Sequence, residues 1–126
     1  HMTEQKTVLI IDDDEMNRMV AKMVLEKSVG CRVIAAPGGF DGITVMSMEP
    51  VDLVLLDLEM PELDGFQTLD IVQKRPDLAA IPVILLTASS DRDTVVRGST
   101  YGIRDYIKKP FLPDDLARRV KKLLLN

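Results

Sequence analysis

The sequence predicts a doubly wound α/β domain, a (βα)5 arrangement with a five-stranded parallel sheet and helices on both faces. Five short apolar runs alternate with segments whose apolar residues recur at helical spacing. Such alternation favours parallel strands joined by right-handed crossovers. The expected strands are residues 7–11, 32–35, 53–56, 83–86 and 105–108. The pattern leaves the order of the strands in the sheet open.

Apolar stripes predict the helices between these strands. In the first helix, four residues share one stripe that we expect to face the core, namely Met16, Val20, Met23 and Val24. Similar stripes predict the third and last helices: Phe66, Leu69 and Val72, then Leu116, Val120, Leu123 and Leu124. Pro113, followed by two aspartates, is typical of the first turn of a helix.

Two helices have weaker signals. The second begins with PGGFDG, residues 37–42, and each glycine costs roughly 1 kcal/mol against alanine in a helix. We therefore expect this helix to fray and residues 37–39 to form a loop. The fourth, near residues 91–100, has Val95 and Val96 as apolar anchors and starts with SDRD, which resembles a capping box. Its helix propensity falls towards its end, so we expect it to move.

The composition predicts one globular domain, residues 1–126, in which His1 and Met2 resemble an expression scar. The chain is 46% hydrophobic and 29% charged, which is sufficient for a core and too apolar for disorder. No apolar stretch approaches the roughly 18 residues of a membrane helix, so we expect a cytoplasmic protein without membrane contacts. The net charge of −4 argues against direct nucleic-acid binding. Cys31, the single cysteine, is predicted to be a buried small hydrophobe.

Polar residues follow four of the five predicted strands. They are Asp12, Asp13 and Asp14 after the first, Asp57 after the third, Thr87 after the fourth, and Lys108 and Lys109 after the fifth. The carboxyl ends of parallel strands meet at one edge, where ligands of open α/β sheets bind. Carboxylates, a hydroxyl and an ammonium at one edge are what a Mg²⁺-assisted phosphoryl site needs. His1 is the only histidine, which excludes ordinary zinc sites and a Ser-His nucleophile.

These segments together resemble the receiver domains of two-component response regulators, which have a flavodoxin-like fold. IIDDDEMNR is similar to the acidic pair of that family, and LLDLEMPELDG to its phospho-acceptor motif. LLTA and DYIKKPF are similar to its threonine and lysine-proline motifs. The resemblance spans the whole chain, with the four motifs in the expected order.

The resemblance implies a role for each matching residue. Asp57 would accept the phosphoryl group, and Asp12, Asp13 and Asp57 would bind Mg²⁺ with the backbone carbonyl of Glu59. Asp14 would then cap the first helix. Thr87 and Lys109 would bind phosphoryl oxygens, and Tyr106 would act with Thr87 as the switch. The family pattern also predicts a cis bond between Lys109 and Pro110, and a phosphoryl lifetime set by Glu59 and Ser89.

The implied function is a signalling switch that catalyses its own phosphorylation and slow dephosphorylation, not an enzyme with a separate substrate. The implied partners are a sensor histidine kinase or phosphotransfer protein, and an output domain or downstream protein. Asp105 and Arg119 fit the charge pairs of a dimer face, but Arg104 stands where many relatives carry an acid. A monomer and a phosphorylation-dependent dimer both stay open.

Three other functions fit part of the pattern. A haloacid-type phosphatase would use Asp12 and Asp14, but it needs acids where this chain has Lys108 and Lys109. A nucleotide-binding domain needs glycines or hydroxyls after the first strand, where the aspartates would repel phosphate. A degenerate receiver that acts only as a protein-interaction module is the remaining alternative.

Overall fold

The computed structural model describes residues 5–89 and 91–125. Its elements, in chain order, are β1 (Thr7–Ile11), α1 (Glu15–Ser28), β2 (Arg32–Ala36), α2 (Gly39–Met48), β3 (Leu53–Asp57), α3 (Gly65–Gln73), α4 (Pro76–Ala79), β4 (Val83–Thr87), α5 (Arg92–Ser99), β5 (Asp105–Lys108) and α6 (Pro113–Leu124). All five predicted strands are present. The four-residue helix α4 is an addition to the predicted pattern.

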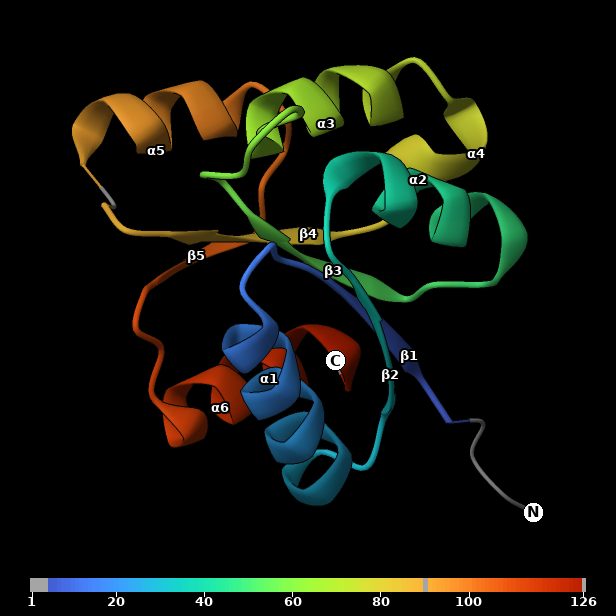
Figure 1. Ribbon diagram of the computed structural model, residues 1–126, viewed down its shortest axis with the longest axis vertical. Helices are drawn as coiled ribbons and strands as arrows, with labels where there is room; N and C mark the ends of the chain where they lie inside the picture. Colours follow the sequence, from blue (N-terminus) through green and yellow to red (C-terminus); the bar gives the residue numbers. More distant parts are fainter. Residues whose placement is uncertain (1–4, 90, 126) are drawn as a thin grey trace.

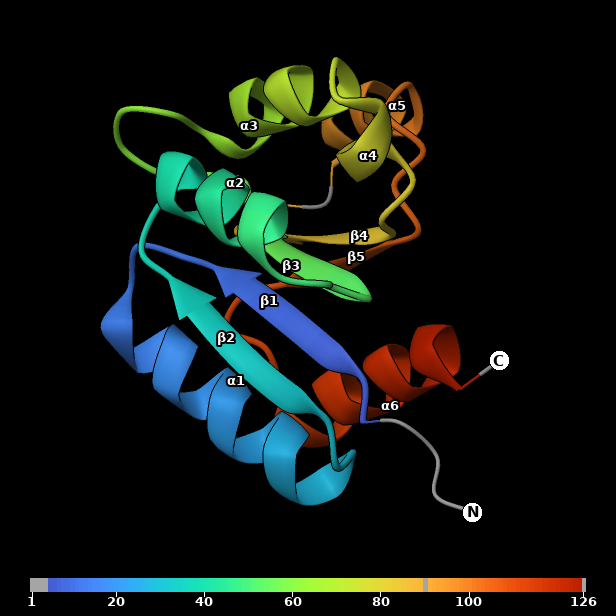
Figure 2. The same cartoon turned by 90° about the vertical axis from the view of Figure 1, so that its right-hand side faces the viewer.

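The five strands form one parallel sheet in the order β2-β1-β3-β4-β5. Helices α1 and α6 cover one face of this sheet, and α2, α3, α4 and α5 cover the other (Figures 1 and 2). The predicted doubly wound fold is therefore confirmed. The strand order reverses between β1 and β3, so the carboxyl ends of these two neighbours mark the switch point where ligands of such sheets bind.

The core consists of two apolar layers, one on each side of the sheet. Every residue of β1, β3 and β4 is buried, because these central strands are covered on both faces. The layer beneath α1 and α6 contains Cys31, which is buried as predicted, and the apolar face of α6. In the other layer Phe66, Leu69 and Val72 of α3 pack against the sheet. No helix in these described ranges is long and apolar enough to cross a membrane.

Two glycines let α2 pack closely instead of weakening it. A Cβ atom on Gly42 would lie 2.3 Å from Cδ1 of Ile11, and one on Gly39 would lie 2.2 Å from Oγ1 of Thr68. Gly39 is the first residue of α2, so the predicted loop ends one residue earlier, at Gly38. The fraying of this helix stays a prediction.

The prediction for the first helix is wrong for two of its four stripe residues. Met16 is 64% exposed and Met23 is 53% exposed, and Met19 between them is 58% exposed. The side of α1 that packs against the sheet and α6 is formed by Ala21, Val24 and Leu25. We call Met16, Met19 and Met23 the methionine face, because they form an uncovered apolar surface along α1.

The anchors predicted for the fourth helix, α5 in the structure, are also wrong. Val95 and Val96 are 38% and 57% exposed. The helix instead packs through Gly98, which is buried, and through Arg97, whose guanidinium lies 4.2 Å from the ring centroid of Phe66. Its N-cap is Asp91, whose side chain accepts a hydrogen bond from a backbone N–H in the first turn. The predicted capping residue Ser90 lies outside the described residues.

Candidate functional site

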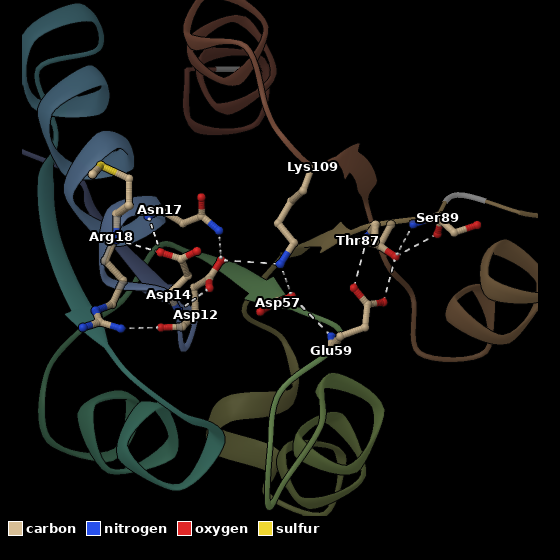
Figure 3. Close-up of polar contacts among 11 residues, drawn as sticks. Asp12, Asp14, Asn17, Arg18, Asp57, Glu59, Thr87, Ser89 and Lys109 are labelled. Atoms are coloured by element: carbon tan, nitrogen blue, oxygen red, sulfur yellow. Dashed lines mark hydrogen bonds and ion pairs between the residues drawn. The ribbon is translucent and has the colours of Figure 1, made fainter.

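The register of the sheet brings four polar side chains together. Ile11 of β1 is level with Leu56 of β3, so Asp12 follows β1 at the level where Asp57 ends β3. Thr87 ends β4 opposite Lys108, and Lys109 comes directly after β5. Asp12, Asp57, Thr87 and Lys109 therefore lie at one edge of the sheet, as predicted, and their contacts are drawn in Figure 3.

Asp57 is a fully buried carboxylate with two unlike oxygens. Its Oδ1 lies 2.8 Å from Nζ of Lys109 and accepts the backbone N–H of Glu59 at 3.3 Å. Its Oδ2 is buried and has no hydrogen-bond partner among the described residues. Burial raises the pKa of Asp57 to about 7, against the hydrogen bond from Lys109 and with help from the charge of Asp12. The site thus holds one carboxylate oxygen free of other interactions.

Three carboxylates converge beside this oxygen. Carboxylate oxygens of Asp12, Asp13 and Asp57 lie within 4.8 Å of one another. Asp12 is fully buried, whereas Asp13 is exposed. An all-oxygen, anionic set of this kind suits a hard divalent cation. The cluster can therefore bind a metal ion.

Lys109 is the cation of the site, and Lys108 is not. Lys108 is exposed at the end of β5, whereas Nζ of Lys109 lies 2.8 Å from Asp57 and 4.0 Å from Oδ2 of Asp12. Burial alone would lower the pKa of Lys109, but its hydrogen bond to Asp57 and the surrounding acids raise it. The bond between Lys109 and Pro110 is cis, as predicted.

Thr87 is fully buried, and its hydroxyl contacts the loop after β4. Its Oγ1 lies 2.7 Å from the backbone oxygen of Ser89 and 3.1 Å from Oε2 of Glu59, and either can accept its proton. It also accepts the backbone N–H of Ser89 at 3.1 Å. The other oxygen of Glu59 accepts the backbone N–H of Ala88 at 3.1 Å. Glu59 therefore reaches the end of β4 with its side chain, which the sequence did not indicate.

Tyr106 lies beneath α5 and is partly buried. Its hydroxyl donates to the backbone oxygen of Val95 at 3.2 Å, and burial raises its pKa. A Cβ atom on Gly98 would lie 2.2 Å from that hydroxyl oxygen, so the glycine makes room for the ring.

Two further residues position the acidic cluster and were missed in the sequence. Nδ2 of Asn17 donates to Oδ2 of Asp12 at 3.2 Å, and Nη1 of Arg18 donates to the backbone oxygen of Asp12 at 2.8 Å. Both come from the first turns of α1, which Asp14 caps as predicted. The signal available in the sequence was that Asn17 and Arg18 are polar residues about one helical turn after the acidic residues.

A comparison with protein families shows which family this chain belongs to. The model of the response regulator receiver domain matches residues 8–121. The chain belongs to this family. It is a receiver domain of the two-component response regulators, and all four resembling motifs lie within the match.

Similar receivers occur in proteins of different lengths. The chain is 35% identical to the probable transcriptional regulator ycf27 of Cyanophora paradoxa, over 95% of this chain and 48% of that protein. It is also 35% identical to the protein PilH of Pseudomonas aeruginosa, over 93% of this chain and 96% of PilH. The chain thus spans about half the length of the transcriptional regulators that it matches.

Solved receiver structures share this fold. The chemotaxis protein CheY4 of Vibrio cholerae has a TM-score of 0.90 at 23% identity, covering 96% of this chain and all of that one. The BeF3-activated receiver domain of DrrB, from Thermotoga maritima, has a TM-score of 0.83 at 30% identity, covering 98% of this chain and all of that one.

Proposed function

We propose that this receiver is a cytoplasmic phospho-accepting switch, in which Asp57 takes a phosphoryl group from a phosphohistidine of a sensor histidine kinase or phosphotransfer protein. One observation carries the proposal. Asp57 has a buried oxygen without a partner, while its other oxygen is fixed by Lys109. A nucleophile at the end of a rigid buried strand is held in line with its target, which is how positioning lowers a barrier.

The groups at this edge supply the protein's part in the transfer. Oδ2 of Asp57 attacks the phosphorus, the bond from phosphorus to the imidazole nitrogen breaks, and its electron pair stays on that nitrogen. Lys109 is close enough to donate to the phosphoryl oxygens. Water later attacks the acyl phosphate, which releases inorganic phosphate and restores the carboxylate. Because the receiver supplies these groups, it catalyses both steps on itself.

The metal in this proposal is Mg²⁺. Asp12, Asp13 and Asp57 would hold it together with the backbone carbonyl of Glu59, and Asn17 would orient Asp12. When bound, Mg²⁺ neutralises charge on the phosphoryl group.

The signal would leave the site through Thr87 and Tyr106. A phosphoryl group on Asp57 offers new acceptors for the Thr87 hydroxyl, which now bonds to the loop after β4. Movement of Thr87 would change the space available to Tyr106 and so the position of α5. We expect a shift between two existing arrangements of this region.

The partners are proposed from the surfaces beside the site. The methionine face begins directly after the Asp14 cap and is adaptable enough to contact a phosphoryl donor. An output domain or downstream protein would read the change in α5 and β5. Asp105 and Arg119 contact one another at 2.7 Å within the chain, so a phosphorylation-dependent dimer would have to rearrange this pair. No direct contact with nucleic acid or membrane is proposed.

Acetyl phosphate tests the proposed reaction without a partner protein. With Mg²⁺, the parent should gain the mass of one phosphoryl group, and with EDTA it should gain none. Asp57→Asn should gain none in either case, while Asp93→Asn, at an exposed position in α5, should behave as the parent. A parent that stays unmodified would instead support the degenerate interaction module.

A further inference from the structure

We propose that Glu59 is a positioning residue that holds the receiver in its unphosphorylated arrangement, by accepting the hydrogen bonds of Thr87 and Ala88. This inference rests on the proposed function, because it concerns the donors that a phosphoryl group on Asp57 would attract. It assigns a role to the Glu59 side chain that is separate from the proposed role of its backbone carbonyl.

The geometry shows one carboxylate facing two donors. Oε2 of Glu59 lies 3.1 Å from Oγ1 of Thr87, and Oε1 lies 3.1 Å from the backbone nitrogen of Ala88. These donors belong to consecutive residues at the end of β4 (Figure 3 labels Glu59 and Thr87). Glu59 itself follows Asp57 by two residues, and its N–H donates to Oδ1 of Asp57. The same side chain therefore links the loop after β3 to the loop after β4.

A phosphoryl group and the Glu59 carboxylate would compete for these donors. Both are anions with acceptor oxygens, and hydrogen bonds to anions are roughly twice as strong as those between neutral groups. The Thr87 hydroxyl has a single proton, for which Oε2 of Glu59 at 3.1 Å and the backbone oxygen of Ser89 at 2.7 Å already compete, and donation to a phosphoryl oxygen would end both contacts. Phosphorylation would therefore release Glu59 from Thr87 and draw the same donors away from its carboxylate.

The Glu59 side chain is also in contact with solvent. Its side chain is exposed, whereas Thr87 is fully buried. The displaced carboxylate can return to water without a buried unpaired charge, which would be costly. Glu59 can therefore contact Thr87 and Ala88 in the unphosphorylated arrangement and leave them in the phosphorylated one.

The first test uses the free receiver without metal or phosphate. We compare the chemical shift of the Ala88 amide proton in the parent, Glu59→Ala, Glu59→Gln and Glu15→Ala. Glu15 is an exposed acid in the first turn of α1, so its removal controls for the loss of one charge at this edge. The Ala88 proton should move upfield in Glu59→Ala, move less in Glu59→Gln, which keeps one acceptor oxygen, and stay near its place in Glu15→Ala.

The second test measures the affinity for fluoroberyllate, a phosphoryl mimic, at saturating Mg²⁺. Glu59→Ala should bind roughly tenfold more tightly than the parent, because about one hydrogen bond no longer has to be broken. Removing a nearby negative charge would also favour an anion, so the comparison is repeated in a Thr87→Val background. There the gain should fall below about threefold, since non-additivity reports a contact that acts through Thr87.

The outcomes separate the two proposals. Equal gains in both backgrounds, with an unmoved Ala88 proton, would overturn the role of Glu59 and leave only a charge effect. A parent that binds no fluoroberyllate and accepts no phosphoryl group would overturn the proposed function. The Ala88 shift in the free protein needs no phosphoryl chemistry, so it still decides whether Glu59 holds the end of β4.

Discussion

At Asp57, the same features that leave an oxygen free for reaction make the carboxylate unfavourable in the folded protein. The side chain is fully buried, and only Oδ1 is compensated, by Lys109 and one backbone N–H. Desolvation of a charge raises its free energy unless every lone pair finds a partner. This burial raises the pKa of Asp57 to about 7 although Lys109 opposes the shift. The acceptor is therefore a local source of instability.

Stability should consequently fall as the pH rises. Burial raises the pKa of Asp57 to about 7 in the folded receiver, while in the unfolded chain its pKa is the ordinary aspartate value of 3.8. The free energy of unfolding in EDTA should thus drop by roughly 2 kcal/mol between pH 5 and 7. Urea unfolding at several pH values measures it. Asp57→Asn should show a much flatter profile, and an equally steep one would assign the trend to other groups.

Asn17 should matter for metal affinity although it lies outside the acidic cluster. Its side chain holds Oδ2 of Asp12 at 3.2 Å, and loss of such an orienting contact typically weakens a metal site about tenfold. Calorimetric titration with Mg²⁺ should therefore show weaker binding for Asn17→Ala. Gln73→Ala removes a similar carboxamide from the end of α3 and should bind as the parent does. Unchanged binding by Asn17→Ala would exclude this support role.

Among the elements, the loop from β3 to α3 fixes where Asp57 points. Asp64 caps α3 in a reciprocal capping box with Gln67. The backbone N–H of Gly65 donates to the oxygen of Leu58 at 2.9 Å, so the start of α3 lies directly on the end of β3. A Cβ atom on Gly65 would lie 2.8 Å from the backbone oxygen of Asp57 and from Cα of Leu58. This close approach requires glycine.

Gly65→Ala should therefore destabilise the receiver by about 2 kcal/mol, because backbone atoms cannot move aside as a flexible side chain can. Gly38→Ala is the matched control, since a Cβ atom there meets nothing within 4 Å and the backbone is extended. It should stay within about 1 kcal/mol of the parent. Denaturant midpoints compare the two, and similar losses in both variants would argue against the close contact.

The elements also show what the sequence could predict. Runs such as residues 53–56 identified the three central strands, because a strand covered on both faces must be apolar throughout. The helical spacing of Met16 and Met23 placed them on one side of α1 but did not show that the helix packs through another side and leaves them exposed. The prediction that Val95 and Val96 anchor α5 was wrong for the same reason, because apolar character alone does not show which side of a helix packs. Helix α4 was not predicted, because its four residues are too few to show a helical repeat of apolar residues.

In the whole molecule, the sequence predicted which residues meet at the edge of the sheet better than it predicted the strand order and the contacts around them. The common carboxyl edge of parallel strands brought Asp57, Thr87 and Lys109 together, and this follows from topology alone. The strand order was not predictable, since several orders bury the same strands. The contact of Glu59 with Thr87 joins residues 28 apart, so it exists only once the sheet has formed.

Across the whole molecule, the response to phosphorylation should be confined to one part of the chain. Central strands are buried on both faces, whereas α5 leaves Val95 and Val96 exposed. Amide hydrogen exchange with and without fluoroberyllate should therefore change most between Thr87 and Tyr106 and little in β1. The fluoroberyllate-treated Asp57→Asn variant is the control, and protection that changes uniformly along the parent chain would contradict a local switch.

The location of the phosphoryl group tests the central claim most directly. The parent is phosphorylated with acetyl phosphate and Mg²⁺, and the acyl phosphate is reduced with borohydride, which converts a phosphorylated aspartate to homoserine. Peptide mass spectrometry then finds the modified position. We expect homoserine at residue 57 and unmodified aspartate at Asp12 and Asp13. Homoserine at either of those two positions, with residue 57 intact, would contradict the assignment of Asp57 as the acceptor.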